Sequence, residues 1–247
     1  MKKAVLLSLV VLAGQTAHAQ SFGDFLRGVL GDADEAEAQS SDRSFASVSS
    51  SDADAGLRQA LTIGAEAVGA QLSQRNGYFG DGDIRIPLPG RLGDLQSQLG
   101  RFGMSGPLDE LQESLNHAAE DAAPYAADLV VDAISSISIE DAFQILNGGN
   151  TAATDFLRGR TEGELTLLVE PYMRSALENS GALSMVDSVA GQYGLQSLSG
   201  DLRDQLIDHA VEEGLDGLFF YLAKEEQEIR SNPVRRTTDL LRRVFGG

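Results

Sequence analysis

The sequence predicts an all-α protein: a single multi-helix domain with one short β-hairpin, preceded by a disordered, acidic, Ser-rich segment. Three observations lead to this fold class. From residue 54 onward, apolar residues recur at helical spacing. Only residues 76–89 break that pattern, with an alternation typical of strands. The chain of 247 residues is 42% hydrophobic and has no Cys, so an apolar core rather than disulfides must stabilise it.

The first 19 residues have the features of a cleaved secretory signal. A positively charged start is followed by an apolar run over residues 4–13, and residues 17–19 (Ala-His-Ala) match the pattern that precedes a cleavage site. The run is too short to anchor the chain in a bilayer, and no Cys follows it for lipid attachment. We therefore expect a mature protein that begins at Gln20 and is located in a bacterial periplasm.

The rest of the chain divides into two parts. Residues 20–53 are acidic and rich in Ser, with one short amphipathic piece at 21–30, which predicts a flexible segment. Residues 54–246 form the predicted helical domain. Removing the two Lys residues of the signal takes the formal net charge from −18 to −20 (−18 − 2). Such a charge disfavours nucleic acid and anionic membranes as partners. No transmembrane anchor is expected, and an envelope protein is the expected class of partner.

The first predicted helix of the domain ends near Arg75. Its apolar stripe consists of Leu57, Leu61, Gly64, Val68 and Leu72. The chain then changes pattern, because Ile84, Ile86 and Leu88 alternate with other residues. A Gly-Asp-Gly-Asp turn at residues 80–83 separates them from an aromatic pair at 78–79. This arrangement predicts the β-hairpin.

Start signals place the later helices. The Gly-Pro pair at residues 106–107 opens one of them, because Pro fits the first helical position. Ser138-x-x-Asp141 and Thr161-x-x-Glu164 both have the spacing of a capping box. The Asn-Pro pair at residues 232–233 starts a last helix.

A long helix is predicted over residues 201–229, and its apolar stripe includes a carboxylate. At about 100° per residue Glu225 falls on that stripe, and Glu226 lies at its edge. A carboxylate on a core face must be paired, because desolvation otherwise costs a large free energy. The expected partners, which follow within a few turns, are Arg230, Arg235 and Arg236.

A second polar pair lies beside the apolar stripe of the helix that opens at residue 106. Asn116 and Glu120 are four residues apart, and the Ala-rich turns after them lead to Pro124. Small residues let another helix approach closely, so we expect both polar groups to be half-buried. His117 projects away from the stripe and is expected to face solvent.

The sequence lacks the common catalytic and metal motifs. It has no two-His zinc spacing, no G-x-S-x-G elbow, no P-loop and no Rossmann glycine pattern. An EF-hand is excluded, because residues 85 and 86 are Arg and Ile where the motif needs a ligand and a glycine. Asn76, Asp81 and Asp83 form a weak calcium candidate, for which a plain turn is the simpler interpretation. No cofactor is indicated.

Several separated blocks of the chain also carry a resemblance. The blocks are Asn116-x-Ala118-Ala119-Glu120-x-Ala122-x-Pro124, Asp141-Ala142-x-x-Ile145-Leu146-x-Gly148, Ala152-Ala153-Thr154 and Glu225-Glu226-x-x-Ile229-Arg230-x-x-Pro233-x-x-Arg236-Thr237-Thr238. Over residues 54–246 they resemble a secreted bacterial family defined only as domain of unknown function 4197. The resemblance implies a predominantly helical, exported protein and brings no activity or cofactor with it.

The polar residues of these blocks allow two interpretations. In the first, they form a buried ion-pair and hydrogen-bond network that fixes the helix packing. The members of that network are Asn116, Glu120, Glu226, Arg230 and Arg236. Asp141 then caps its helix, and Thr154 bonds back to a carbonyl. In the second interpretation the same residues form a functional site. Active sites also cluster carboxylates beside arginines, because such neighbours shift the pKa values of the catalytic groups.

Three classes of function remain. The sequence favours a non-catalytic periplasmic binding or interaction module. One alternative is a carrier that holds a small or apolar ligand between helices, although the Ala- and Gly-rich helices favour close packing. The other is a carboxylate-based hydrolase or lyase, with or without a metal, that uses Glu120 or Glu226 as general base. The missing His, Cys and Ser signatures weigh against an enzyme.

Overall fold

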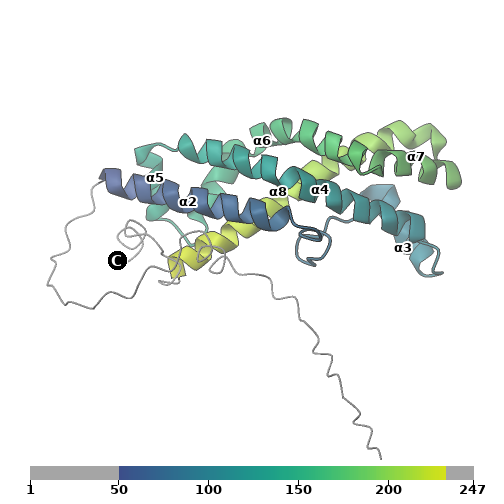
Figure 1. The fold of residues 1–247 in the computed structure, drawn as a ribbon, viewed down its shortest axis with the longest axis horizontal. Helices are drawn as coiled ribbons and strands as arrows, with labels where there is room; N and C mark the ends of the chain where they lie inside the picture. Colours follow the sequence, from purple (N-terminus) through teal and green to yellow (C-terminus); the bar gives the residue numbers. More distant parts are fainter. Residues whose placement is uncertain (1–49, 232–247) are drawn as a thin grey trace, which may run out of the picture. The chain divides into compact units, whose positions relative to one another are not determined.

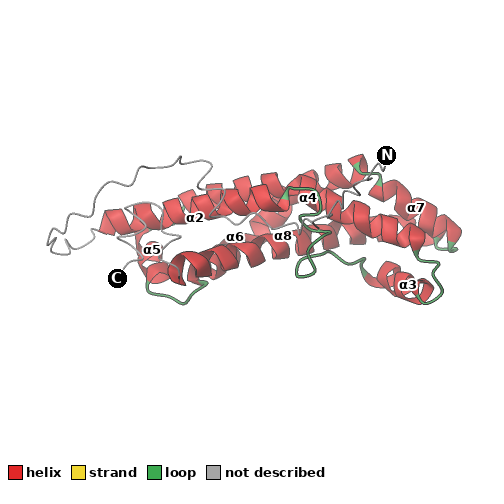
Figure 2. Ribbon diagram, turned by 60° about the horizontal axis from the view of Figure 1, so that its bottom comes forward, coloured by secondary structure: helices red, strands yellow, loops and turns green. Residues whose placement is uncertain are grey.

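Seven α-helices and one short 3-10 helix make up most of residues 50–231 (Figure 1). They are α2 (Ser50–Leu72), α3 (Gly90–Gly100), α4 (Gly106–Ser135), α5 (Ile139–Leu146), α6 (Ala152–Asn179), α7 (Ala182–Gln192), η1 (Gln196–Leu198) and α8 (Ser199–Ser231). These residues contain no β-strand (Figure 2). The prediction of an all-α fold is therefore confirmed for this part of the chain.

The computed structural model describes residues 50–231, all of which belong to one unit of the chain. The predicted signal at 1–19 and the helix predicted after residue 232 lie outside the described residues. Most of the segment predicted to be flexible, residues 20–53, lies outside them as well. Its last residues are helical, because α2 begins at Ser50 rather than at the expected boundary of 54.

Four long helices, α2, α4, α6 and α8, pack side by side around a common core (Figure 1). Helix α4 contacts each of the other three, and α8 contacts α2 and α6. The shorter helices cover the ends of this bundle: α5 packs against α2 and α6, and α7 packs against α4, α6 and α8. The stripe predicted for residues 201–229 lies within α8, whose apolar face is buried as expected.

Helices α2 and α4 approach each other closely because their facing residues are small. The α4 residues that lie nearest to Gly69 of α2 are Ala123 and Ala127, and both are buried. On α2, a Cβ atom added at Gly69 would lie only 2.5 Å from the Cβ of Ala127. No side chain larger than hydrogen therefore fits at Gly69 while the two helices keep this separation.

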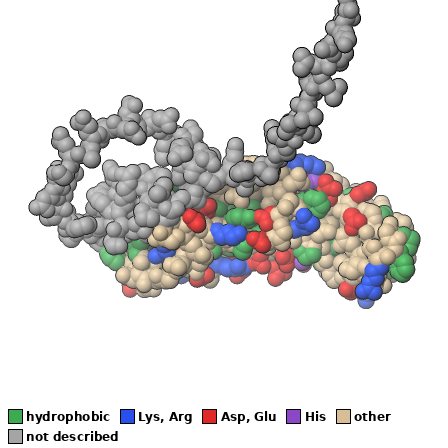
Figure 3. Space-filling view, turned by 90° about the horizontal axis from the view of Figure 1, so that it is seen from below, with side chains coloured by type: hydrophobic (Ala, Val, Ile, Leu, Met, Phe, Trp, Pro, Cys, Tyr) green, Lys and Arg blue, Asp and Glu red, His purple; other side chains and the backbone are tan. Residues whose placement is uncertain are grey.

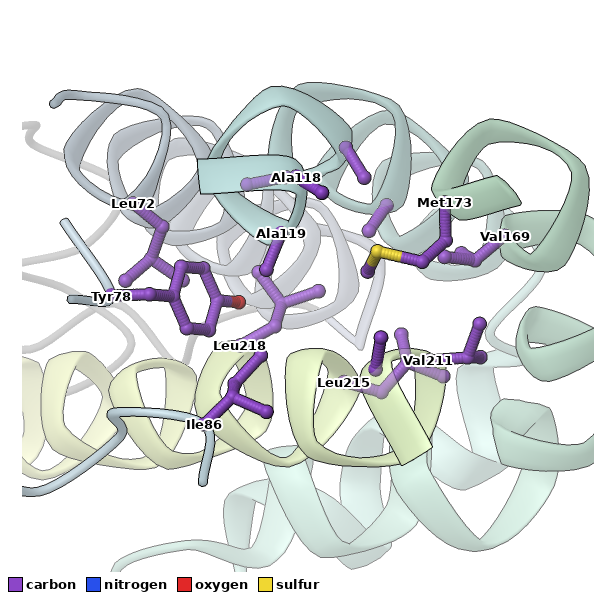
Figure 4. Close-up of a cluster of buried hydrophobic side chains, with 14 of the residues drawn as sticks. Leu72, Tyr78, Ile86, Ala118, Ala119, Val169, Met173, Val211, Leu215 and Leu218 are labelled. Carbon is purple, nitrogen blue, oxygen red and sulfur yellow. The ribbon is translucent and has the colours of Figure 1, made fainter. Parts of the chain in front are cut away.

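Most buried apolar residues belong to one cluster, part of which is shown in Figure 4. The residues labelled in that view are Leu72, Tyr78, Ile86, Ala118, Ala119, Val169, Met173, Val211, Leu215 and Leu218, and each is buried. Two of them, Tyr78 and Ile86, come from the irregular segment between α2 and α3 rather than from a helix. That segment is therefore part of the core.

The β-hairpin predicted for residues 76–89 is wrong. A series of turns leads into an extended stretch over this range, and no strand pairs with it in residues 50–231. The alternation has a different cause. Ile84, Ile86 and Leu88 are buried against the bundle, whereas Arg85 and Pro87 are exposed. The segment is an extended chain that lies across helices, and side chains of α4 replace the missing strand.

Of the four predicted helix starts, two are confirmed, and the one at residues 232–233 lies outside the described residues. Helix α4 begins at Gly106 with Pro107 in its first turn, and Ser138 and Asp141 form a complete capping box at the start of α5. The capping box predicted at Thr161 is wrong. Thr161 lies inside α6, where its hydroxyl donates to the backbone carbonyl of Leu157 at 2.6 Å. A Thr inside a helix often makes this bond to the preceding turn.

Candidate functional site

Glu120 on α4 holds the turn that follows α2. Its Oε2 accepts the backbone N–H of Asn76 at 3.1 Å, and its Oε1 accepts those of Tyr78 at 3.1 Å and Phe79 at 3.2 Å. Asn76 has a φ of 65°, in the left-handed region that Asn tolerates better than most residues. The carboxylate is buried and takes three backbone donors that would otherwise lack partners.

Asn116, one turn before Glu120, binds the extended stretch as a neighbouring strand would. Its Oδ1 accepts the backbone N–H of Ile86 at 2.8 Å, and its Nδ2 donates to the Ile86 carbonyl at 2.8 Å. The same Nδ2 donates to the carbonyl of Gln112 at 2.8 Å. Because one amide side chain satisfies both backbone groups of Ile86, this stretch needs no second strand.

Tyr78 ties the same segment to α8. Its hydroxyl donates to the backbone carbonyl of Gly214 at 2.7 Å, and a Cβ added at Gly217 would lie 2.6 Å from the tyrosine ring. The absence of a side chain at Gly217 therefore makes room for the ring. Burial, with a smaller effect from the Glu120 charge, raises the pKa of Tyr78 well above its ordinary value.

His117 lies beside this cluster and is not solvent-facing, so that expectation is wrong. Its side chain is 15% exposed, and its Nε2 is buried without a hydrogen-bond partner in the described part of the chain. Oε1 of Glu113 and Oε2 of Glu120 both lie 3.9 Å from this nitrogen, which is too far for a hydrogen bond. The ring of Phe79 meets the imidazole edge-on at 6.0 Å between centroids.

Glu226 on α8 caps the beginning of α6. Its Oε1 accepts the backbone N–H of Ala153 at 2.9 Å, and its Oε2 accepts both the N–H and the hydroxyl of Thr154 at 2.9 Å. Thr151, the residue in the N-cap position of α6, makes no capping bond through its own side chain. A buried negative charge at a helix N-terminus is favourable, because the unpaired N–H groups and the macrodipole both attract it.

Arg230, one turn after Glu226, caps the end of α5. Its Nη2 donates to the carbonyl of Ile145 at 2.9 Å, and its Nε donates to Oε1 of Glu226 at 2.9 Å. The end of α5 and the start of α6 are separated by only five residues, 147–151. One ion pair on α8 therefore supplies a cation to the negative end of one helix and an anion to the positive end of the next.

The residues singled out from the sequence thus fall into two groups. Asn116 and Glu120 hold the segment between α2 and α3, whereas Thr154, Glu226 and Arg230 join α8 to the α5–α6 turn. Among the described residues no hydrogen bond or ion pair joins the two groups, so they do not form one network. Thr154 donates to Glu226 and does not bond back to a carbonyl, contrary to expectation.

The other candidates lie apart from these groups. Asp141 belongs to the capping box of α5, and the hydrogen bond from the Ser138 hydroxyl holds the pKa of Asp141 below its ordinary value. Arg160 approaches the same carboxylate at 3.3 Å. Glu225 faces α2: a Cβ atom added at Gly64 of α2 would lie 3.9 Å from the Cβ of Glu225. Arg236 lies outside the described residues.

The three residues of the weak calcium candidate are engaged in other contacts. Asn76 donates its backbone N–H to Glu120, and the Asp81 carboxylate accepts the backbone N–H of Asp83 and the hydroxyl of Tyr221. Asp83 pairs with Lys224 at 3.3 Å. Within residues 50–231, no group of three or more His, Cys, Asp or Glu side chains is placed to hold a metal ion.

Two cavities adjoin these residues. One of about 20 Å³ lies between α2 and α8 beside Glu226, and it has room for about one water molecule. A second, of about 390 Å³, is an open polar cleft between the start of α6, α8 and the segment before α3. Its charged lining residues are Asp83, Arg85, Asp155, Arg158, Glu213 and Asp216. The cleft contains four acids and two bases, and Arg158 pairs directly with Asp216.

The chemistry open to the two buried carboxylates is limited by their partners. Glu226 accepts four hydrogen bonds, which matches the roughly four lone-pair sites that a carboxylate offers. Glu120 accepts three backbone N–H groups. A general base needs a lone pair aimed at its substrate, so both carboxylates are better suited to holding backbone groups in place.

The sequence reasoning missed a surface feature on the outside of α4 and α6. Tyr125 and Tyr172 stack with ring centroids 4.5 Å apart and an interplanar angle of 14°. They are 49% and 43% exposed, and Leu168, one turn before Tyr172, is 43% exposed. We call these three residues the tyrosine seam. A signal was present in the sequence, since Leu168 and Tyr172 lie off the buried stripe of Leu165, Val169 and Met173.

Each tyrosine of the seam directly follows a proline inside its helix, Pro124 in α4 and Pro171 in α6. A proline in a helix interior cannot donate to the carbonyl four residues earlier and tends to kink the helix. The repeated Pro-Tyr pair is a second sequence signal for this surface.

The fold and its buried polar contacts define a class: a helical-bundle protein in which acidic and amide side chains hold the connecting segments against the helices. The sequence profile of one family, described as protein of unknown function (DUF4197), matches residues 47–246. The chain belongs to this family, which confirms the resemblance carried by the polar blocks. No curated protein and no solved structure matches the chain.

Proposed function

We propose that this protein is an exported, non-catalytic interaction module that binds a partner protein in the bacterial envelope. Export rests on the features of the first 19 residues, which are a charged start, a short apolar run and an Ala-His-Ala pattern. None of the described helices combines the length and the apolar character that a membrane crossing requires.

The observation that carries the binding role is the exposed tyrosine seam. Stacked aromatic rings and a leucine would gain free energy if a partner covered them, and aromatic residues are enriched at protein interfaces. Tyrosine is also among the residues that dominate binding energy, because it offers a large contact area with few rotatable bonds.

The alternative functions receive less support. Glu120 and Glu226 would serve an enzyme as general base, yet each is already used as an acceptor for several backbone groups. A carrier of an apolar ligand needs an enclosed cavity of several hundred Å³. The apolar cavity between α2 and α8 is about 20 Å³, so it is far too small for such a ligand.

Site-specific photocross-linking in living cells tests this proposal. A photoreactive amino acid replaces Leu168 in the seam or, as a matched control, Phe102, which is also apolar and is 75% exposed between α3 and α4. We expect a cross-linked species of higher mass in the periplasmic fraction from position 168 and none from position 102. Equal cross-linking at both positions, or recovery of the protein only in the cytoplasm, would contradict the proposal.

A further inference from the structure

The charges around the tyrosine seam are distributed unevenly. Helix α4 contains no Lys or Arg along its 30 residues. Asp121, Asp128 and Asp132 lie four residues before, three after and seven after Tyr125, so helical geometry places them on the same face. All three aspartates are exposed. The seam is therefore bordered along α4 by carboxylates with no base on the same helix.

The α6 side of the tyrosine seam is also bordered by an acidic residue. Glu164 lies one turn before Leu168 and is exposed. The basic residue nearest in sequence, Arg174, is held by Glu170 at 2.8 Å, and Asp204 of α8 also influences its pKa, so it lies toward α8. On the face shown in Figure 3, basic and acidic side chains are interspersed.

We propose that the tyrosine seam binds a cationic amphipathic helix of a partner protein, an inference that rests on the binding role proposed above. An apolar stripe on that helix would cover Tyr125, Leu168 and Tyr172, and Lys or Arg residues beside the stripe would meet the three aspartates of α4. The row from Asp121 to Asp132 spans about 17 Å at 1.5 Å per residue, which is about three helical turns. A partner rich in phosphate is disfavoured, because the same carboxylates repel it.

This type of recognition follows from general physics. An amphipathic helix binds a groove or surface through apolar residues at i, i+3, i+4 and i+7. The area covered supplies most of the affinity, and complementary charges set the orientation and exclude partners of the wrong sign. The stacked pair of rings is also pre-ordered, so little side-chain entropy is lost when a partner covers it.

The test uses two synthetic helices of about 14 residues, a length that covers the row of aspartates. Both carry Leu on one stripe, and the polar positions are Lys in one peptide and Glu in the other. Binding to the signal-cleaved chain is followed by fluorescence anisotropy at about 20 mM and about 200 mM NaCl, since screening weakens contacts between exposed charges. We expect the Lys peptide to bind, more weakly at the higher salt, and the Glu peptide not to bind.

Two protein variants with the same change in net charge make the test specific. The first is D121N/D128N/D132N on α4, and its matched control is D204N/D208N/E212Q, three exposed carboxylates on α8. We expect the α4 variant to weaken binding of the Lys peptide about tenfold and the control to change it by less than about twofold. Equal losses in both variants would overturn the inference, because net charge alone would then explain the binding.

Further outcomes separate this inference from the proposed function. If photocross-linking at position 168 captures a partner but the Lys peptide does not bind, the interaction module stands and the cationic-helix inference is wrong. If the peptide binds but no partner is cross-linked, the proposed function is wrong. If the protein associates with itself on gel filtration and D121N/D128N/D132N abolishes that association, the occupant is a second copy, and the inference of a different partner protein is overturned.

Discussion

At the scale of single residues, a few buried polar side chains serve as substitutes for backbone partners. Asn116 presents one acceptor and one donor to Ile86, as an adjacent strand would. Glu120 takes three N–H groups of a turn, and Glu226 takes two N–H groups at the start of a helix. Each of these carboxylates is held by hydrogen bonds to its charged form, which is how a buried charge becomes tolerable.

Replacing Glu226 with Ala should destabilise the fold by about 3–5 kcal/mol, because it removes the carboxylate that accepts from the start of α6 and from the Arg230 Nε. Glu228, on an exposed position of the same helix, provides the control, and Glu228→Ala should change stability by less than about 0.5 kcal/mol. Urea unfolding followed by circular dichroism measures both variants. Equal stabilities for the two variants would mean that Glu226 does not hold the α5–α6 turn.

At the scale of helices, the bundle depends on how closely neighbouring helices approach. Helices α2 and α4 meet through alanines and Gly69, and α8 accommodates the Tyr78 ring at Gly217. Some other helix glycines have no such role. A Cβ added at Gly163 in α6 would meet nothing within 4 Å, and this position is exposed. The same substitution should therefore have opposite effects at the two kinds of position.

Gly69→Ala should lower the free energy of unfolding by about 1–3 kcal/mol, since overpacking outweighs the better helix propensity of Ala. Gly163→Ala should raise it by up to about 1 kcal/mol, because propensity acts there without a steric cost. Thermal unfolding of the two variants beside the wild type measures both effects. A Gly69→Ala protein as stable as Gly163→Ala would show that α2 and α4 can separate at little cost.

The all-α class and the starts of α4 and α5 could be predicted from local patterns, but those patterns could not exclude the hairpin. Ile84, Ile86 and Leu88 alternate in burial whether the chain pairs with another strand or lies across a helix. The backbone N–H and carbonyl of Ile86 could bond to a strand or to the side chain of Asn116. Which of the two occurs depends on contacts between residues 30 positions apart. Sequence periodicity does not contain that information.

At the scale of the whole molecule, two tyrosines make the stability of the fold depend on pH in the alkaline range. Burial raises the pKa of Tyr78, and burial together with the hydrogen bond to Asp81 raises the pKa of Tyr221. In the unfolded chain both phenols ionise near their ordinary pKa of about 10. The folded protein thus retains protons that the unfolded chain releases, so stability is complete below pH of about 10 and falls as the pH rises further.

Tyr78→Phe should therefore lose less stability between about pH 9 and about pH 11 than the wild type does. At neutral pH it should be less stable by about 1 kcal/mol, because the hydrogen bond to the Gly214 carbonyl is gone. Tyr125→Phe, on an exposed ring, is the control for the pH dependence. Urea midpoints at the two pH values measure the difference. If the midpoint falls by the same amount in all three proteins between these pH values, Tyr78 is not the group responsible for the loss of stability.

The sequence by itself determined the all-α class of the described residues, the placement of α4, α5 and α8, and the family. These properties are encoded locally, in periodicity, capping residues and short motifs. Only the tertiary structure decided that Asn116 and Glu120 hold one segment while Glu226 and Arg230 hold another, and that two tyrosines stack on the surface. The physical reason is that hydrogen-bond partners and exposure depend on which helices meet, and those contacts join residues that lie far apart in the chain.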